Sequence, residues 1–199
     1  MLKLLYASPS PYSAKVRMAA TYAGVELDAV KTDTNNPTDE LLKANPLGKI
    51  PVLLIGDGEA VFDSAAIVQY LNRTSKGALF PRNAAKRTEA ERLEALADGI
   101  CDCLLAHVYE RRFRPEEMVQ QDWLDKQWTK VTRALDALNA SPPKLPKKIH
   151  AGHLALRACL GYLALRFEGK WERGRSKLVR WTKRFDEKFP EMAELTPRG

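Results

Sequence analysis

Apolar and polar positions along the first 45 residues change period several times. Residues 3–7, KLLYA, are a short apolar run that is typical of a buried strand, and apolar residues recur at helical spacing from Val16 to Ala23, before Gly24. Residues 25–30, VELDAV, alternate as a strand does, and residues 35–45, NNPTDELLKAN, favour a short helix. The pattern therefore predicts strand, helix, strand and helix in that order.

The clearest local signal is a hairpin in residues 50–63, IPVLLIGDGEAVFD. Two runs that favour strands, Val52–Ile55 and Ala60–Phe62, flank the turn GDG, whose glycines can adopt positive φ. The next residues, SAAIVQYL, predict a helix with Ser64 as its N-cap. The resulting order βαβαββα is that of a thioredoxin-like domain with a parallel crossover and a final antiparallel hairpin.

The rest of the chain reads as helix throughout. A capping-box pattern at Thr88 and Glu91 begins one long helix, a second ends near Asn139, and residues 153–167, HLALRACLGYLALRF, are apolar enough for a buried helix. A last amphipathic helix is marked by Leu178, Trp181, Phe185 and Phe189. We therefore expect an α/β domain in residues 1–78, a linker in residues 79–87 and an all-helical domain in residues 88–199.

Composition places the chain among ordinary globular proteins, with 45% hydrophobic and 29% charged residues in 199. We expect neither a membrane span nor a secretory signal, which favours the cytoplasm. The three cysteines have no zinc or disulfide spacing and are expected to be packing residues. No metal site is expected.

The formal net charge of +7 comes from the second half of the chain. Residues 1–100 hold 12 Lys and Arg against 12 Asp and Glu, whereas residues 101–199 hold 20 against 13. The excess gathers in Glu168 to Lys188, which could bind an anionic partner such as nucleic acid. Because acidic residues interleave there, we favour a solvated helix face and do not expect nucleic acid as a partner.

Four segments together resemble a cytosolic glutathione transferase of bacterial type over essentially the whole chain. They are SPSPYSAKVR, NPLGKIPVL, FDSAAIVQYL and the buried helix around Gly152 to Arg166. The resemblance implies a thioredoxin-like domain followed by a helical domain, glutathione as co-substrate, and a detoxifying activity. It also implies a homodimer, with the first long helix of each subunit at the interface and the N-terminal domain touching the partner.

The resemblance assigns glutathione-binding roles to five residues. The Ile50–Pro51 bond is expected to be cis and to present the backbone of Ile50 to the cysteinyl part of glutathione, with Lys49 toward the glycyl end. Asp63 would pair with the γ-glutamyl ammonium, and Ser64 with its carboxylate at a helix N-terminus. For Pro51 alone a simple strand start, and for Ser64 alone simple capping, are the alternatives.

A hydroxyl at a helix N-terminus can stabilise the thiolate of glutathione, whose thiol pKa is otherwise about 8.5. The segment SPYS has the shape of a thioredoxin-type Cys-Pro-aromatic-Cys site, and it puts Ser10 at the catalytic position implied by the resemblance. Tyr6 is the alternative, because other classes of the family keep a catalytic Tyr there. Ser8 and Ser13 suit turn and cap roles better.

A serine cannot form a mixed disulfide, so we predict conjugation, isomerisation or peroxide reduction by a glutathione S-transferase. The alternatives are a non-catalytic transferase-like binding protein that uses its basic C-terminal half, and a glutathione-dependent thiol-disulfide reductase. An electrophilic second substrate would contact Tyr12, Tyr109 and Arg112, although simple surface solvation is the favoured explanation of the last two.

The expected buried helix departs from the family pattern at its start. The places of the usual Ser/Thr-x-x-Asp capping pair hold His150 and His153. A histidine pair can still cap the helix, and it predicts lower stability at low pH. Metal binding by the pair is not expected, since no carboxylate or Cys lies nearby in the sequence.

Overall fold

The N-terminal half is built on a four-stranded sheet. The computed structural model describes residues 1–56 and 58–199, so Asp57 in the expected hairpin turn lies outside the described residues. The strands are β1 (Leu2–Tyr6), β2 (Leu27–Lys31), β3 (Val52–Gly56) and β4 (Glu59–Val61), in the spatial order β2-β1-β3-β4. β1 pairs parallel to β2, while β3 is antiparallel to both β1 and β4. This is the mixed sheet that the sequence predicts.

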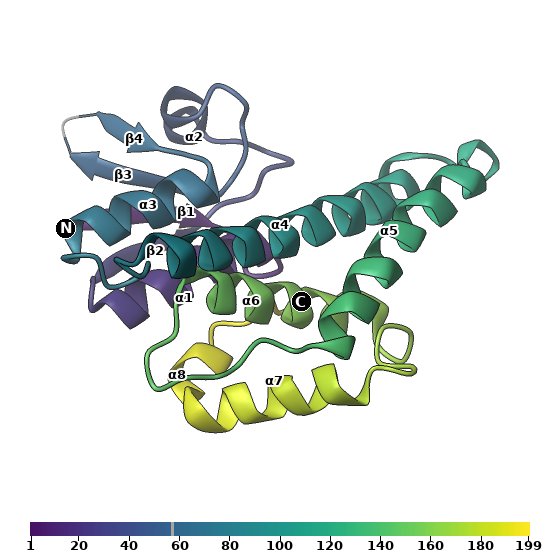
Figure 1. Cartoon of the computed structure of the whole chain (residues 1–199). Coiled ribbons are helices and arrows are strands. Elements are labelled where there is room, and N and C mark those ends of the chain that lie inside the picture. Colours follow the sequence, from purple (N-terminus) through teal and green to yellow (C-terminus); the bar gives the residue numbers. More distant parts are fainter. Residues whose placement is uncertain (57) are drawn as a thin grey trace.

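Helices cover both faces of this sheet (Figure 1). α1 (Pro11–Ala23) and α3 (Ser64–Thr74) pack together against one face, and the short α2 (Asp39–Ala44) lies against the other. α1 ends where Gly24 adopts a left-handed conformation with φ of 68°, which suits a residue without a Cβ. Leu41 of α2 completes a small separate core with Leu5 and Val52.

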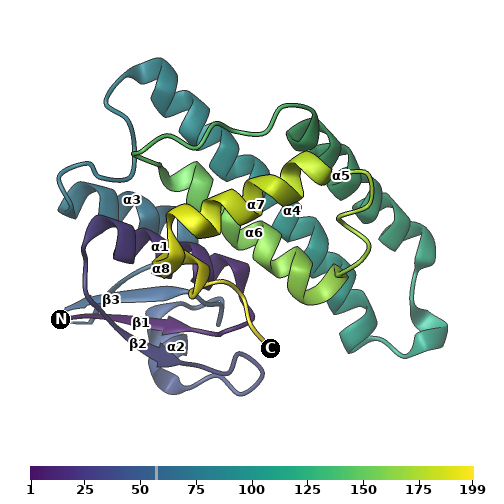
Figure 2. The same cartoon turned by 90° about the horizontal axis from the view of Figure 1, so that it is seen from below.

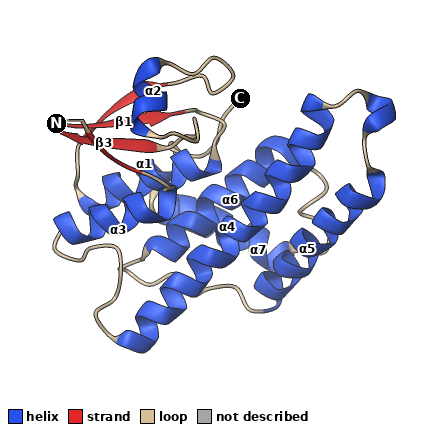
Figure 3. Ribbon diagram, turned by 90° about the horizontal axis from the view of Figure 1, so that it is seen from above, coloured by secondary structure: helices blue, strands red, loops and turns tan. Residues whose placement is uncertain are grey.

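The C-terminal half contains only helices and their connections within the described residues (Figure 3). They are α4 (Ala84–Phe113), the 3-10 turn Glu116–Met118, α5 (Gln121–Ala140), α6 (Ala151–Phe167), α7 (Ser176–Lys188) and α8 (Pro190–Ala193). α6 is buried over most of its length and packs against α4 on one side and α1 on the other. One continuous apolar core thus joins the two halves.

The element order and the α/β plus all-α class agree with the sequence prediction, but two details differ. α4 begins at Ala84 with Asn83 as its N-cap, because the Asn83 side chain accepts a hydrogen bond from the Lys86 amide. The capping-box pattern at Thr88 therefore lies inside the helix. Leu96 shares the helical spacing of the apolar residues Leu93 and Ile100, which predicts a buried position, but it is 38% exposed. The domain limits themselves stay a prediction.

Among the described residues, no helix combines the length and the apolar character that crossing a bilayer requires.

Candidate active site

Three segments that the sequence singles out meet at one end of the sheet. Val52 pairs with Leu5, so Pro51 lies opposite the end of β1, where the chain turns toward Ser10. Leu53 pairs with Val61, so Asp63 follows β4 at the same end. The topology alone therefore gathers the first turn, the prolyl strand start and the start of α3 around a common space.

Ser10 is the N-cap of α1. Its backbone is extended, and its Oγ accepts a hydrogen bond of 3.1 Å from the Ser13 amide. Pro11 occupies the first helical position, where its missing N–H removes no helical bond. Because Oγ already accepts from the backbone, its own O–H proton is left to donate outward, at the positive end of a 13-residue helix.

The turn that carries Ser10 is held by its neighbours. The Ser10 amide donates to the Ala7 carbonyl over 3.1 Å, and the Ala7 amide donates to Ser13 Oγ over 3.5 Å. Ser13 therefore supports the turn as expected. Tyr6, the alternative thiol partner, is 8% exposed, and the Arg17 guanidinium lies 4.8 Å from the centroid of its ring.

The Ile50–Pro51 peptide bond is cis, as the resemblance implies. The Lys49 carbonyl just before it accepts a hydrogen bond of 2.8 Å from Asn45 Nδ2, and Asn45 Oδ1 accepts from the Leu47 amide over 3.1 Å. Asn45 is buried, so both ends of its amide are used inside the turn. The one signal for Asn45 in the sequence is the dipeptide Asn-Pro, which is typical of a turn.

The N-cap of α3 is Asp63, which corrects the prediction of Ser64. The Asp63 carboxylate accepts from the amides of Ala65 at 3.0 Å and Ala66 at 3.4 Å, whereas Ser64 is the first helical residue and is buried. A charged acceptor satisfies the free amides of a helix start better than a hydroxyl does. Both Asp and Ser suit the cap, and only the backbone conformation distinguishes them. Asp63 is exposed, so its carboxylate is open to solvent on the side away from the helix.

The three residues predicted for a second-substrate pocket are not gathered in one place. The Tyr12 hydroxyl donates a short hydrogen bond to Asp102 of α4, and burial together with this bond raises the pKa of Tyr12. Tyr109 lies two helical turns further along α4, where the Arg112 guanidinium approaches its ring centroid at 5.7 Å. Tyr12 thus joins the two domains, and Tyr109 pairs with Arg112.

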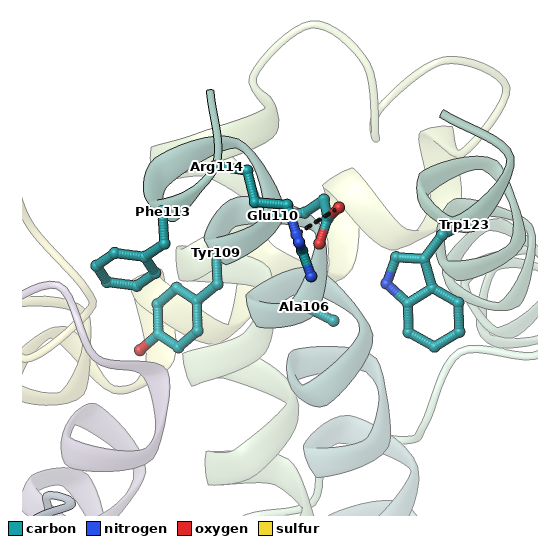
Figure 4. A pocket seen from close by; sticks show the side chains of 6 residues that line it. All are labelled: Ala106, Tyr109, Glu110, Phe113, Arg114 and Trp123. Carbon is teal, nitrogen blue, oxygen red and sulfur yellow. Dashed lines mark ion pairs between the residues drawn. The ribbon is translucent and has the colours of Figure 1, made fainter. Parts of the chain in front are cut away.

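Tyr109 lines a hollow of about 450 Å³ between α4 and α5 (Figure 4). The Tyr109 and Phe113 rings lie at one side with their centroids 5.4 Å apart, and Trp123 of α5 lies at the other. The Glu110–Arg114 ion pair, at 2.9 Å, lies between them. Tyr12 and Arg112 do not line this hollow.

Nothing in the sequence pattern singles out Lys15 as a buried residue. It is nevertheless 1% exposed, and its ammonium lies 2.6 Å from Asp98 and 3.3 Å from Glu94 of α4. Burial raises the pKa of both carboxyl groups, and the Lys15 ammonium opposes that rise. The three charges join the thioredoxin-like half to the helical half just behind Ser10.

Comparison with known proteins places this geometry in a family. The family model for the glutathione S-transferase N-terminal domain matches residues 9–74. The uncharacterized GST-like protein YibF of Escherichia coli K12 is 31% identical over 169 residues, which cover 83% of this chain and 83% of YibF.

Two solved structures match this chain over its full length. A glutathione S-transferase from Methylobacillus flagellatus, solved with GSH bound, has a TM-score of 0.90 and 34% identity, and each chain is covered completely. A glutathione transferase family member from Pseudomonas fluorescens Pf-5, solved with bound glutathione, has a TM-score of 0.87 and 31% identity, again with complete coverage of both chains. The chain therefore belongs to the glutathione S-transferase family.

Proposed function

We propose that this protein is a glutathione S-transferase in which the Ser10 hydroxyl donates a hydrogen bond to the glutathione thiolate. The observation that carries the proposal is the cap geometry: Ser10 Oγ accepts from the Ser13 amide, which leaves the hydroxyl proton free at the positive end of α1. Each unit by which the thiol pKa falls corresponds to about 1.4 kcal/mol, within the range of one charge-assisted hydrogen bond.

The remaining anchors surround the same end of the sheet. The backbone of Ile50, before the cis Pro51, would pair with the cysteinyl unit of glutathione as an added strand does. Asp63 would bind the γ-glutamyl ammonium while its other contacts cap α3, and the first amides of α3 with Ser64 would face the carboxylate. Lys49, which is exposed, would lie toward the glycyl carboxylate.

The reaction requires little else from the protein. The thiol proton leaves to solvent, the sulfur attacks an electrophilic carbon or a peroxide oxygen, and the leaving group departs with the bonding electrons. Tyr109 and Arg112 would meet the electrophile, and Tyr12, held by Asp102, would shape the wall nearer to Ser10. We propose detoxification of electrophiles in the cytoplasm as the setting.

Substitution of Ser10 tests the proposal. Ser10→Ala should lower kcat for conjugation of an aromatic halide by about 10- to 100-fold, while the Kd for glutathione measured by calorimetry changes only a few fold. Ser10→Thr, which keeps a hydroxyl cap, should retain most of the activity. If Ser10→Ala were as active as wild type while Tyr6→Phe lost most of its activity, the hydrogen bond to the thiolate would be assigned to Tyr6.

The two alternative functions predict different results. A glutathione-dependent reductase would turn over hydroxyethyl disulfide faster than an aromatic halide, which the serine disfavours. A non-catalytic binding protein would show no turnover of either substrate and no retention on immobilised glutathione. Retention with halide conjugation supports the transferase.

We also propose a homodimer. The exposed large apolar side chains include Phe62, at 37% just before α3, and Leu96, at 38% on α4, one in each half of the chain. These are the two regions that the family resemblance puts at the subunit interface. Light scattering after gel filtration should give about twice the mass of 22.4 kDa, and Phe62→Ser with Leu96→Ser should give a monomer.

A further inference from the structure

The basic residues of the C-terminal half form a surface that the transferase reaction does not use. Four cations of α7 recur at spacings of three and four residues and therefore share one face of the helix: Lys177, Arg180, Arg184 and Lys188. All four are exposed. α7 lies on the side of the molecule opposite to the sheet (Figure 1), away from the candidate glutathione site.

Three more cations lie on a neighbouring segment. The connection between α5 and α6 lies along α7 (Figure 1), held there by hydrogen bonds from Trp181 Nε1 to the Pro143 carbonyl at 2.8 Å and from Lys188 Nζ to the Leu145 carbonyl at 2.9 Å. This connection carries three exposed lysines: Lys144, Lys147 and Lys148. We call these three lysines and the four α7 cations together the basic face.

The fold separates the acidic residues that interleave with these cations in the sequence. Asp186 lies on the other side of α7, where it binds Arg157 at 2.6 Å. Glu187 is the one acidic residue of α7 beside the basic face. No ion pair within residues 1–56 and 58–199 involves any of the seven cations.

Removal of these seven would leave 25 Lys and Arg against 25 Asp and Glu. The basic face thus carries a charge equal to the whole formal net charge of the protein. A concentration of this kind on one face is the electrostatic footprint of a polyanion site, not of a solvated helix with mixed charge.

The side chains around the basic face indicate whether it suits a membrane surface, a single-stranded nucleic acid or a duplex. No large apolar side chain in residues 141–199 is exposed, so the surface has nothing to insert into a bilayer and no aromatic ring on which a single-stranded base could stack. Lys177 to Lys188 span about 16 Å of helix. A DNA duplex of that length carries about ten phosphate charges on its two strands, which is of the same order as the seven cations of the basic face.

We propose that the basic face binds the phosphate backbone of double-helical nucleic acid without sequence preference. The proposal does not depend on the transferase activity, because none of the seven residues belongs to the candidate active site. The lysines and arginines would act by charge alone, so the affinity should fall steeply as salt displaces them.

Fluorescence anisotropy with a fluorescein-labelled DNA duplex of about 20 base pairs tests the proposal across about 50 to 200 mM NaCl. The wild-type protein should bind at low salt with a slope of log K against log salt between about −4 and −6. The variant Lys177→Glu, Arg180→Glu, Arg184→Glu should bind at least about 30-fold more weakly, with a slope shallower by about 3.

A control variant with the same charge change at other positions distinguishes the effect of the basic face from the effect of net charge. Lys31→Glu, Arg73→Glu, Lys86→Glu makes the same charge change at exposed positions in and next to the N-terminal domain and should bind within about threefold of wild type. Circular dichroism confirms that both variants are folded. Equal losses in the two variants, no duplex binding by the wild type at low salt, or binding to phosphatidylserine vesicles without binding to the duplex would each overturn the proposal.

Discussion

The backbone N–H of Arg198 donates a hydrogen bond of 3.0 Å to the carbonyl oxygen of Ser8. The C-terminal tail is thereby tied to the turn that precedes Ser10 (Figure 2). Pro197 is buried against Gly161 of α6, where a Cβ would lie only 2.8 Å from the proline ring. The last residues of the chain thus help to position the first turn.

Arg198→Pro removes the N–H that holds the Ser8 carbonyl. We expect kcat/KM for glutathione conjugation to fall about fivefold, the equivalent of one neutral hydrogen bond, because the Ser10 turn loses a support. Arg198→Ala keeps the N–H and should match wild type. Steady-state kinetics of the two variants decide this, and equal losses in both would assign the effect to the guanidinium instead.

Lys15, Glu94 and Asp98 form a buried ion triad behind the active site. Removal of its cation should cost more stability than removal of one of its anions. Lys15→Met leaves Glu94 and Asp98 buried without a cation and should lower the free energy of unfolding by about 3–5 kcal/mol. Glu94→Gln removes one of two like charges, while the closer Lys15–Asp98 pair remains, and should cost much less. Urea denaturation measures both, and a Lys15→Met protein as stable as wild type would show that the triad stabilises nothing.

Periodicity predicts the elements of this fold well because each strand and helix buries a face defined by its own residues. The βαβαββα order and the buried α6 follow from spacing within segments of 3 to 17 residues. The caps are less predictable: at Asp63 and Ser64 two adjacent residues both suit the position, and the backbone alone selects between them.

Contacts between distant segments explain what the sequence analysis missed. The partners of Lys15 lie about 80 residues away in the sequence, so a lysine that looks solvated proves to be buried. The acidic residues of α7 also look interleaved until Asp186 is paired with Arg157, 29 positions earlier. Residue spacing carries no information about such partners.

Asn45 predicts a link between the prolyl turn and glutathione affinity. Asn45→Ala removes both the donor to the Lys49 carbonyl and the acceptor for the Leu47 amide, and should cost about 1–3 kcal/mol of stability. The Kd for glutathione should rise as Lys49 and Ile50 lose their position. Asn45→Asp keeps only the acceptor and should fall between wild type and Asn45→Ala. Calorimetry measures the Kd and urea denaturation measures the stability. An unchanged Kd would show that the Asn45 turn does not position the glutathione site.

The histidine pair at the start of α6 predicts a loss of stability in mild acid. His153 Nδ1 accepts from the His150 amide at 3.3 Å, while Nε2 lies 2.8 Å from the Lys144 carbonyl, to which it can donate. A neutral ring satisfies both bonds, and a proton on Nδ1 would face the amide. The His150 and His153 rings lie 3.8 Å apart, so charge on one disfavours charge on the other.

Burial lowers the pKa of both rings, that of His150 to about 4 with a contribution from His153. The unfolded chain, with a His pKa near 6.5, therefore takes up protons first as the pH falls. The free energy of unfolding should therefore be highest above about pH 6.5 and should fall as the pH drops toward 4. The expected loss is about 1–2 kcal/mol, after allowance for the solvent exposure of His150. Thermal unfolding at about pH 7.5 and pH 5 measures the loss, and His150→Ser with His153→Asp should reduce it, because that pair caps without a titrating ring. A difference between the two pH values that is as large in the double variant as in wild type would place the titration elsewhere.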